Sequence, residues 1–217
     1  RYSDGVGLFR SEFLYLGHRT LPTEEEQLQT YRKVLMTFGK RPVILRTMDI
    51  GGDKQLDCLD LPKEDNPVLG NRALRLCFTH PDVFRTQLRA ALRASVYGNL
   101  WIMFPMVGSM DDIRKAKSFV SEVQEELRSE GIAFREDVKI GIMIEIPSIA
   151  MLADIAAEEV DFASIGTNDL TQYTLAVDRV GAGVERYYRP LHPALLRLLH
   201  STAAAFSAQG KPLGVCG

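Results

Sequence analysis

DFASIGTNDLTQYTLAVDR, residues 161–179, joins a short apolar strand directly to a helix. The strand runs to Ile165, and the helical spacing that follows is carried by Leu170, Tyr173 and Thr174. Asn168 and Asp169 fall at the junction of the two elements. A carboxylate and an amide at the carboxyl end of a strand, beside the N–H groups of a helix start, suit an anion or a metal. We therefore expect other strands to bring polar partners to the same place.

Size and composition favour an ordinary globular domain. At 217 residues, with 46% hydrophobic and 25% charged residues, the chain is expected to form one domain over residues 1–217. The net charge of −2 gives no reason to expect nucleic acid or an anionic membrane as a partner. No apolar run reaches the ~20 residues that a membrane helix needs, and no signal peptide opens the chain. Three cysteines without metal or disulfide spacing point to the cytoplasm.

Apolar strands alternate with amphipathic helices along the whole sequence. The expected strands are residues 5–10, 42–46, 100–106, 140–145, 161–165 and 212–216. The clearest helix begins at a capping box of Thr23 and Glu26 and ends at Gly39. Continuous apolar strands indicate a parallel sheet covered by helices on both faces. No G-x-G-x-x-G joins a strand to a helix, so a (β/α)8 barrel is favoured over a dinucleotide-binding sheet.

Two segments between these elements stand out. Residues 51–72 form a long irregular stretch, and loops of this length are usually functional. Arg85, Arg89 and Arg93 line one face of the helix that follows Pro81, at i, i+4 spacing. Such a stripe is most often a solvated face, and we predict that role here.

Polar residues end most of the predicted strands, and a barrel gathers strand ends at one mouth, where barrel enzymes keep their chemistry. These residues are Arg10, Arg46, Glu145, Asn168 with Asp169, and Cys216. Each alone could be a surface ion pair or a small buried side chain. Together, the arginines suit a multiply charged anion such as a phosphate, and the two carboxylates suit Mg²⁺. A phosphorylated small carboxylate would satisfy all these charges, and Cys216 could move a proton to or from a carbon centre.

Four segments resemble the phosphoenolpyruvate-utilising enzymes. They are RTMDIGGDK (46–54), NPVLGNRALR (66–75), IMFPM (102–106) and IGTNDLTQYTLAVDR (165–179). Within that family the chain is most similar to the C-terminal domain of enzyme I of the bacterial sugar phosphotransferase system, the phosphoenolpyruvate–protein phosphotransferases. The similarity runs from GVGLFRSEF to PLGVCG. Pyruvate phosphate dikinase and phosphoenolpyruvate synthase share the GTNDLTQ core, and TLAVDR with RALR favours enzyme I.

The resemblance implies a (β/α)8 barrel that binds phosphoenolpyruvate with Mg²⁺ and, by analogy with the family, forms a homodimer. It implies that Arg10, Arg46, Arg72 and Arg179 bind the substrate together with Asn168 and Asp169, and that Glu145 and Asp169 ligate the metal. Cys216 matches the family's proton donor, which protonates the enolate carbon to give pyruvate. The phosphoryl group would pass to a histidine on a separate N-terminal domain and then to a carrier protein for sugar uptake.

The chain also departs from the family pattern. None of its four histidines matches the family's phosphoryl-accepting motif, and the family's barrel has a further strand on each side of this segment. We therefore expect a fragment with six of the eight barrel strands, which binds phosphoenolpyruvate weakly or not at all without the other two and is inactive without the histidine domain. A dikinase or synthase domain, and a phosphoenolpyruvate-sensing or dimerisation module without catalysis, are the alternatives.

Overall fold

The computed structural model describes residues 3–16, 19–51, 59 and 61–217, which fall into two compact units. The first contains residues 1–103 and 115–139, and the second contains residues 104–114 and 140–217. Whether residues 1–217 act as one domain stays a prediction. His18, Cys58 and the last residues of the RTMDIGGDK segment lie outside the described residues.

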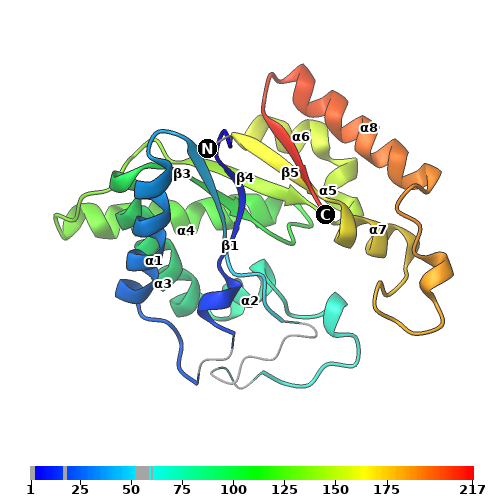
Figure 1. The fold of residues 1–217 in the computed structure, drawn as a ribbon, viewed down its shortest axis with the longest axis horizontal. Coiled ribbons are helices and arrows are strands. Elements are labelled where there is room, and N and C mark those ends of the chain that lie inside the picture. The colour runs from blue at the N-terminus through cyan, green and yellow to red at the C-terminus, as the bar shows by residue number, and fades with distance from the viewer. Residues whose placement is uncertain (1–2, 17–18, 52–58, 60) are drawn as a thin grey trace. The chain divides into compact units, whose positions relative to one another are not determined.

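Parallel strands and their covering helices build the first unit (Figure 1). Its strands are β1 (Val6–Arg10), β2 (Pro42–Arg46) and β3 (Asn99–Phe104), which pair in chain order. Its helices are α1 (Glu24–Phe38), α2 (Leu74–Thr79), α3 (Pro81–Ala94) and most of α4 (Met110–Ser129), with short 3-10 turns at Glu12–Leu14, Pro67–Leu69 and Ser95–Tyr97. Arg10 pairs with Arg46 in the β1–β2 register, so the ends of both strands are level.

The second unit repeats the same alternation of strand and helix. It holds β4 (Lys139–Ile144), α5 (Pro147–Met151), α6 (Ala153–Glu159), β5 (Phe162–Gly166), α7 (Thr167–Leu175), a 3-10 turn at Glu185–Tyr187, α8 (Pro193–Ala208) and β6 (Leu213–Cys216). Strands β4, β5 and β6 are parallel neighbours in that order, and α8 packs on α5 and α6 (Figure 1). All six predicted strands are present, which confirms the α/β class with parallel strands.

Helix α1 forms where the capping box predicted it. The Thr23 hydroxyl accepts a hydrogen bond from the Glu26 backbone N–H, and the Glu26 carboxylate accepts one from the Thr23 N–H at 2.8 Å. Gly39 ends the helix at φ +59°, a conformation that favours glycine. Leu28, Tyr31 and Leu35 bury the apolar stripe, and α1 lies side by side with α3 (Figure 1).

The arginine stripe on α3 is not a solvated face, which corrects the sequence prediction. Arg89 Nε lies 2.8 Å from Glu24 of α1, and its Nη2 lies 2.6 Å from Glu130 at the end of α4. Its neighbours Arg85 and Arg93 pair in the same way with glutamates of α4 and α1. The hydrogen bond to Glu130 raises the pKa of Arg89 well above its usual range. The stripe therefore ties three helices together.

Helix α2 was not predicted, because it is only six residues long and follows the irregular stretch. It begins after Ala73, whose φ of +52° is unusual for a residue with a side chain. The Ala73 N–H donates to the Ile50 carbonyl at 2.8 Å, and Ala73 is fully buried. Tertiary contact, not local propensity, therefore sets the start of this helix.

Candidate functional site

A buried ion-pair cluster occupies the end of β2. Arg46 Nη1 lies 3.0 Å from Asp49 Oδ2, and its Nη2 lies 2.6 Å from Glu12 Oε1. Arg72 Nη2 lies 3.0 Å from the other Asp49 oxygen, so one carboxylate bridges two of the predicted substrate-binding arginines. All four side chains are at least nine-tenths buried. The structure thus brings Arg46 and Arg72 together, with their charges balanced by two carboxylates.

The loop that carries Arg72 can approach this cluster because residue 51 is glycine. Gly51 has φ +115°, and a Cβ there would lie 2.7 Å from Arg72 Cα and from the Asn71 carbonyl oxygen. Any other residue would push the two backbones apart. Part of the irregular stretch is thereby fixed against the end of β2.

A buried polar network supports the same strand end from behind. The Gln87 amide nitrogen of α3 donates to Ser11 Oγ at 3.0 Å and to the Tyr31 hydroxyl at 3.3 Å. Ser11 in turn donates to the Arg46 carbonyl at 2.9 Å, while Gln87 Oε1 accepts from the Met48 N–H at 2.8 Å. Burial raises the pKa of the Tyr31 hydroxyl well above its usual range, which keeps it neutral. The backbone from the Arg46 carbonyl to Met48 is therefore held by side-chain hydrogen bonds. Arg10, level with Arg46 on β1, is exposed.

In the second unit, three strands place a carboxylate, a glycine and a thiol in one row. Ile144 pairs with Ile165, so Glu145 is level with Gly166, and Gly166 pairs with Cys216. Glu145 is fully buried, and its Oε1 accepts from the Met106 N–H at 2.6 Å. A Cβ on Gly166 would lie 2.7 Å from Glu145 Oε2, so the carboxylate fills the space that a side chain would need. Cys216 is partly exposed on the other side of Gly166.

The start of α7 carries the other predicted residues. Asp169 is buried and Asn168 is exposed in the first turn, beside the N-terminal backbone N–H groups of the helix. Arg179 Nη1 lies 3.8 Å from Asp169 Oδ2, and its backbone N–H donates to the Gln172 side chain at 2.9 Å. The Tyr188 hydroxyl donates to Asn168 Oδ1 at 3.3 Å, which leaves the amide nitrogen of Asn168 to donate elsewhere.

The donor set of the second unit fits Mg²⁺. Glu145 and Asp169 offer hard oxygen ligands, and both are buried, where a carboxylate is stabilised by a nearby cation. Within the described ranges, no group of three or more acidic, histidine or cysteine side chains forms a metal centre. Magnesium commonly uses one or two protein carboxylates and takes its remaining ligands from substrate and water.

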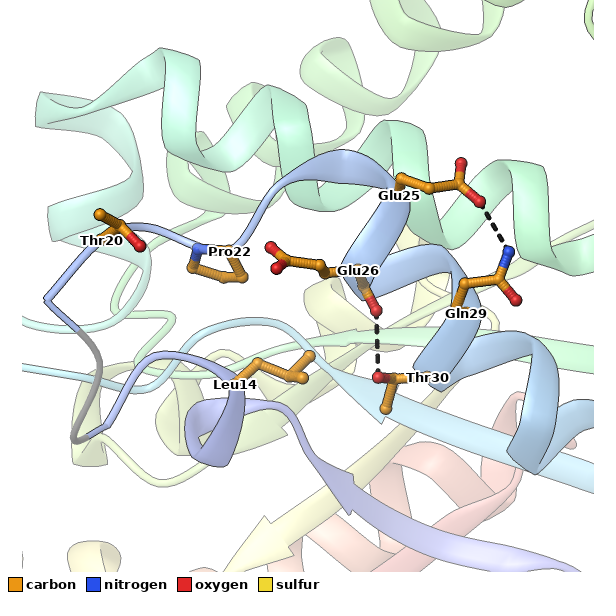
Figure 2. Close-up of a pocket in the computed structure, with 7 residues that line it drawn as sticks. All are labelled: Leu14, Thr20, Pro22, Glu25, Glu26, Gln29 and Thr30. Atoms are coloured by element: carbon orange, nitrogen blue, oxygen red, sulfur yellow. Dashed lines mark hydrogen bonds between the residues drawn. The ribbon is translucent and has the colours of Figure 1, made fainter.

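A surface pocket at the start of α1 contains none of the predicted residues (Figure 2). It is lined by Leu14, Thr20, Pro22, Glu25, Glu26, Gln29 and Thr30. Its polar side chains already bond one another and the helix: Gln29 donates to Glu25 at 2.6 Å, and Thr30 donates to the Glu26 carbonyl at 3.1 Å. The pocket therefore offers no set of polar groups directed at a ligand.

Sequence reasoning missed the residues that position the predicted ones. Glu12 and Asp49 each follow a strand-end arginine by two or three residues, and this spacing was the available signal. Gln87, Gln172 and Tyr188 lie on helices or loops, and their roles follow from long-range contacts alone. Of the histidines, His192 caps α8 by accepting a hydrogen bond from the Ala194 N–H.

Solved structures share the fold at low sequence identity. A HpcH/HpaI aldolase/citrate lyase family protein from Burkholderia cenocepacia matches 99% of this chain and 81% of its own, with a TM-score of 0.55 and 14% identity. A malate synthase of Haloferax volcanii matches 89% of this chain and 45% of its own, with a TM-score of 0.57 and 17% identity. These likenesses concern the fold, and they agree with the predicted barrel-type α/β class. No helix of the described part is long and apolar enough to cross a membrane.

Much closer relatives carry the name phosphoenolpyruvate-protein phosphotransferase. The protein of Priestia megaterium is 56% identical over 214 residues, and that of Staphylococcus carnosus is 54% identical over 215. Each alignment covers 99% of this chain and 37–38% of the relative, so the chain spans less than two-fifths of the relatives' length. The family model described as PEP-utilising enzyme, PEP-binding domain, matches residues 2–217. The chain therefore belongs to the family of phosphoenolpyruvate-utilising enzymes, of which it carries the phosphoenolpyruvate-binding domain.

Proposed function

We propose that this chain binds phosphoenolpyruvate with Mg²⁺ and forms the part of a phosphoenolpyruvate–protein phosphotransferase that cleaves the substrate to pyruvate. In the whole protein the phosphoryl group would pass to a histidine on a separate domain and then to a carrier protein of sugar uptake. The observation that supports the proposal most is the row of Glu145, Gly166 and Cys216, which puts a buried carboxylate and a thiol level on either side of β5. The relatives are phosphoenolpyruvate-protein phosphotransferases by name, which favours this reaction over that of a dikinase or synthase.

Each group has a chemical task in this reaction. Arg46 and Arg72, oriented by their shared carboxylate, would hold oxygens of the phosphate or carboxylate, with Arg10 and Arg179 as further donors. Glu145 and Asp169 would hold Mg²⁺, which when bound neutralises charge on substrate oxygens. The Asn168 amide would donate to the substrate, since Tyr188 occupies its carbonyl oxygen. Cys216 would deliver a proton to the enolate carbon that remains after the phosphoryl group leaves.

The charges of these side chains explain why metal and substrate would bind together. In the first unit Arg46 and Arg72 are balanced by Glu12 and Asp49, and the second unit contributes Arg179 against the carboxylates of Glu145 and Asp169. Side chains without a net positive charge attract the phosphoenolpyruvate trianion weakly. A bound divalent cation adds positive charge and therefore strengthens the attraction. We expect that EDTA weakens phosphoenolpyruvate binding at least tenfold, measured by calorimetry.

Two variants test the proposal in the whole protein that carries this chain. Asp169→Ala is expected to abolish Mg²⁺-dependent phosphoenolpyruvate binding in calorimetry, while Asp154→Ala, an exposed carboxylate on α6, leaves it unchanged. Cys216→Ala is expected to keep binding but stop pyruvate formation with the histidine domain present. Retained Mg²⁺-dependent binding in Asp169→Ala would remove that residue as a ligand. Pyruvate formation at the normal rate in Cys216→Ala would limit Cys216 to a packing role.

Three further features stay proposals. We infer a cytoplasmic protein from cysteine usage and a homodimer from the family resemblance. We also infer that the phosphoryl-accepting histidine belongs to another part of the protein, since the relatives are far longer than this chain. Size-exclusion chromatography with light scattering measures the oligomeric state, and a monomer at micromolar concentration with Mg²⁺ and substrate present would contradict the dimer.

A further inference from the structure

The side chain of Ser164 on β5 contacts the sulfur of Cys216 on β6. Its hydroxyl donates to Cys216 Sγ at 3.5 Å, a normal distance for a hydrogen bond to sulfur. The contact follows from the strand register: Ser164 pairs with Gly214 and Gly166 pairs with Cys216, so both side chains project from the same face of β5 and β6. Gly166, which pairs with Cys216, has no side chain. The thiol therefore contacts Ser164, the preceding residue on the same face of β5.

The two partners differ in their access to water. Ser164 is 4% exposed, whereas Cys216 is partly exposed near the end of β6. Water therefore competes little for the serine hydroxyl, and its hydrogen bond to sulfur is stronger than on an open surface. A substrate can still reach the thiol. This combination suits a group that must hold a reactive sulfur in one orientation without covering it.

We propose that Ser164 is a positioning residue for Cys216, holding the thiol in place and stabilising the thiolate that remains when the proton has left. The inference rests on the proposed function of Cys216 and names a residue that the sequence did not. In the proton transfer, the π electrons of the enolate C=C bond form the new C–H bond, and the enolate C–O bond becomes the carbonyl of pyruvate. The S–H bonding pair stays on Cys216 as a thiolate, to which the Ser164 O–H donates. Solvent later returns the proton, so no oxidant or reductant is needed.

Hydrogen bonds to charged groups are stronger than those between neutral groups, so the serine favours the thiolate over the thiol. The charged side chains nearest to this corner in the register and on the following helix are Glu145 and Asp169. Both are present in the wild type and in any Ser164 variant. Their influence on the sulfur therefore cancels when the two proteins are compared.

The first test measures thiolate formation without substrate or metal. Iodoacetamide alkylation of Cys216 is followed by mass spectrometry in EDTA, for wild type, Ser164→Ala and Ser164→Thr. We expect Ser164→Ala to react about tenfold more slowly than the wild type at pH 7, and Ser164→Thr to recover the wild-type rate. Alkylation of the buried Cys77 reports loosening of the first unit, and hydrogen exchange of the β5 and β6 backbone amides reports loosening of the second. Equal rates at pH 7, or faster alkylation together with faster exchange, would overturn the proposal.

The second test measures catalysis in the whole protein. Ser164→Ala is expected to lower kcat for pyruvate formation about tenfold and to leave KM for phosphoenolpyruvate unchanged, because the serine touches the sulfur and not the substrate's charged groups. A rise in KM at constant kcat would contradict the inference. The alkylation result stands apart from the proposed function: if Cys216→Ala still forms pyruvate, the catalytic role of the thiol fails, while slower alkylation of Ser164→Ala still shows the coupling of the two side chains.

Discussion

Gly166→Ala is the sharpest test of the row that links β4, β5 and β6. Gly166 has φ −88°, outside the left-handed region that favours glycine, so the effect of alanine is mainly steric. The new Cβ would lie 2.7 Å from Glu145 Oε2, 2.9 Å from Met143 Cε and 3.0 Å from Glu145 Cβ. Glu145 is fully buried and its other oxygen is held by the Met106 N–H, so the carboxylate has no free direction in which to move.

The magnitude follows from these contacts. Overpacking of a buried site costs about 1–3 kcal/mol, and loss of a hydrogen bond to a buried charge costs a similar amount. We expect Gly166→Ala to lower the free energy of unfolding by about 2–4 kcal/mol in urea denaturation followed by circular dichroism. If Glu145 is a metal ligand, its displacement weakens Mg²⁺-dependent phosphoenolpyruvate binding about 10–100-fold in calorimetry.

Gly214→Ala on the neighbouring strand is the matched control. An added Cβ there meets Ser164 Oγ at 3.5 Å, an ordinary contact, so stability and binding are expected to stay within about 1 kcal/mol of the wild type. If Gly166→Ala behaves like this control in both assays, the close packing of Glu145 on Gly166 is wrong. If it destabilises the protein but binds Mg²⁺ and substrate normally, Glu145 is not a ligand.

Three further predictions follow from single contacts. Asp49→Asn leaves two buried arginines with one carboxylate and is expected to destabilise the protein by about 3 kcal/mol in urea denaturation. Tyr188→Phe frees the carbonyl oxygen of Asn168 and is expected to raise KM for phosphoenolpyruvate several-fold with little change in kcat. The hydrogen bond from Arg89 lowers the pKa of Glu130, so this ion pair stabilises the protein fully above about pH 4.3, and the stabilisation is lost as the pH falls. The thermal stability of Glu130→Gln is therefore expected to fall less steeply in acid than that of the wild type.

One result would contradict each of these three predictions. Asp49→Asn as stable as the wild type would show that Glu12 alone balances both guanidinium groups. An unchanged KM in Tyr188→Phe would show that the Asn168 amide needs no orientation by the tyrosine. If thermal stability falls as steeply with pH in Glu130→Gln as in the wild type, groups other than Glu130 cause the loss of stability in acid.

The strand ends could be predicted because their signal is local. Several apolar runs end in a charged residue, as in residues 42–46 and 140–145, and a parallel sheet places such ends at one edge. The capping box of α1 is equally local, since its two partners are three residues apart. These features need no knowledge of what lies elsewhere in the chain.

The partners of the predicted residues could not be found in this way. Arg46 pairs with a carboxylate 34 residues earlier in the chain, and Gln87 bonds a backbone N–H 39 residues away. The sequence does contain one signal of a long-range contact. The arginines of α3 recur every four residues, and so do Glu122 and Glu126 on α4 and Glu130 directly after it. Two complementary stripes predict a helix interface, whereas a single stripe predicts a solvated face.

The function that we propose depends on strand register as much as on residue identity. Side chains alternate between the two faces of a strand, so residues that pair across neighbouring strands share a face. Glu145, Gly166 and Cys216 are level on three strands, and Ser164 is two residues before Gly166 on the same face. A slip of one residue between β5 and β6 would turn the thiol away from both the serine and the carboxylate. Strand register thus sets a carboxylate, a thiol and a hydroxyl side by side at the ends of neighbouring strands, and this arrangement is what the proposed chemistry requires.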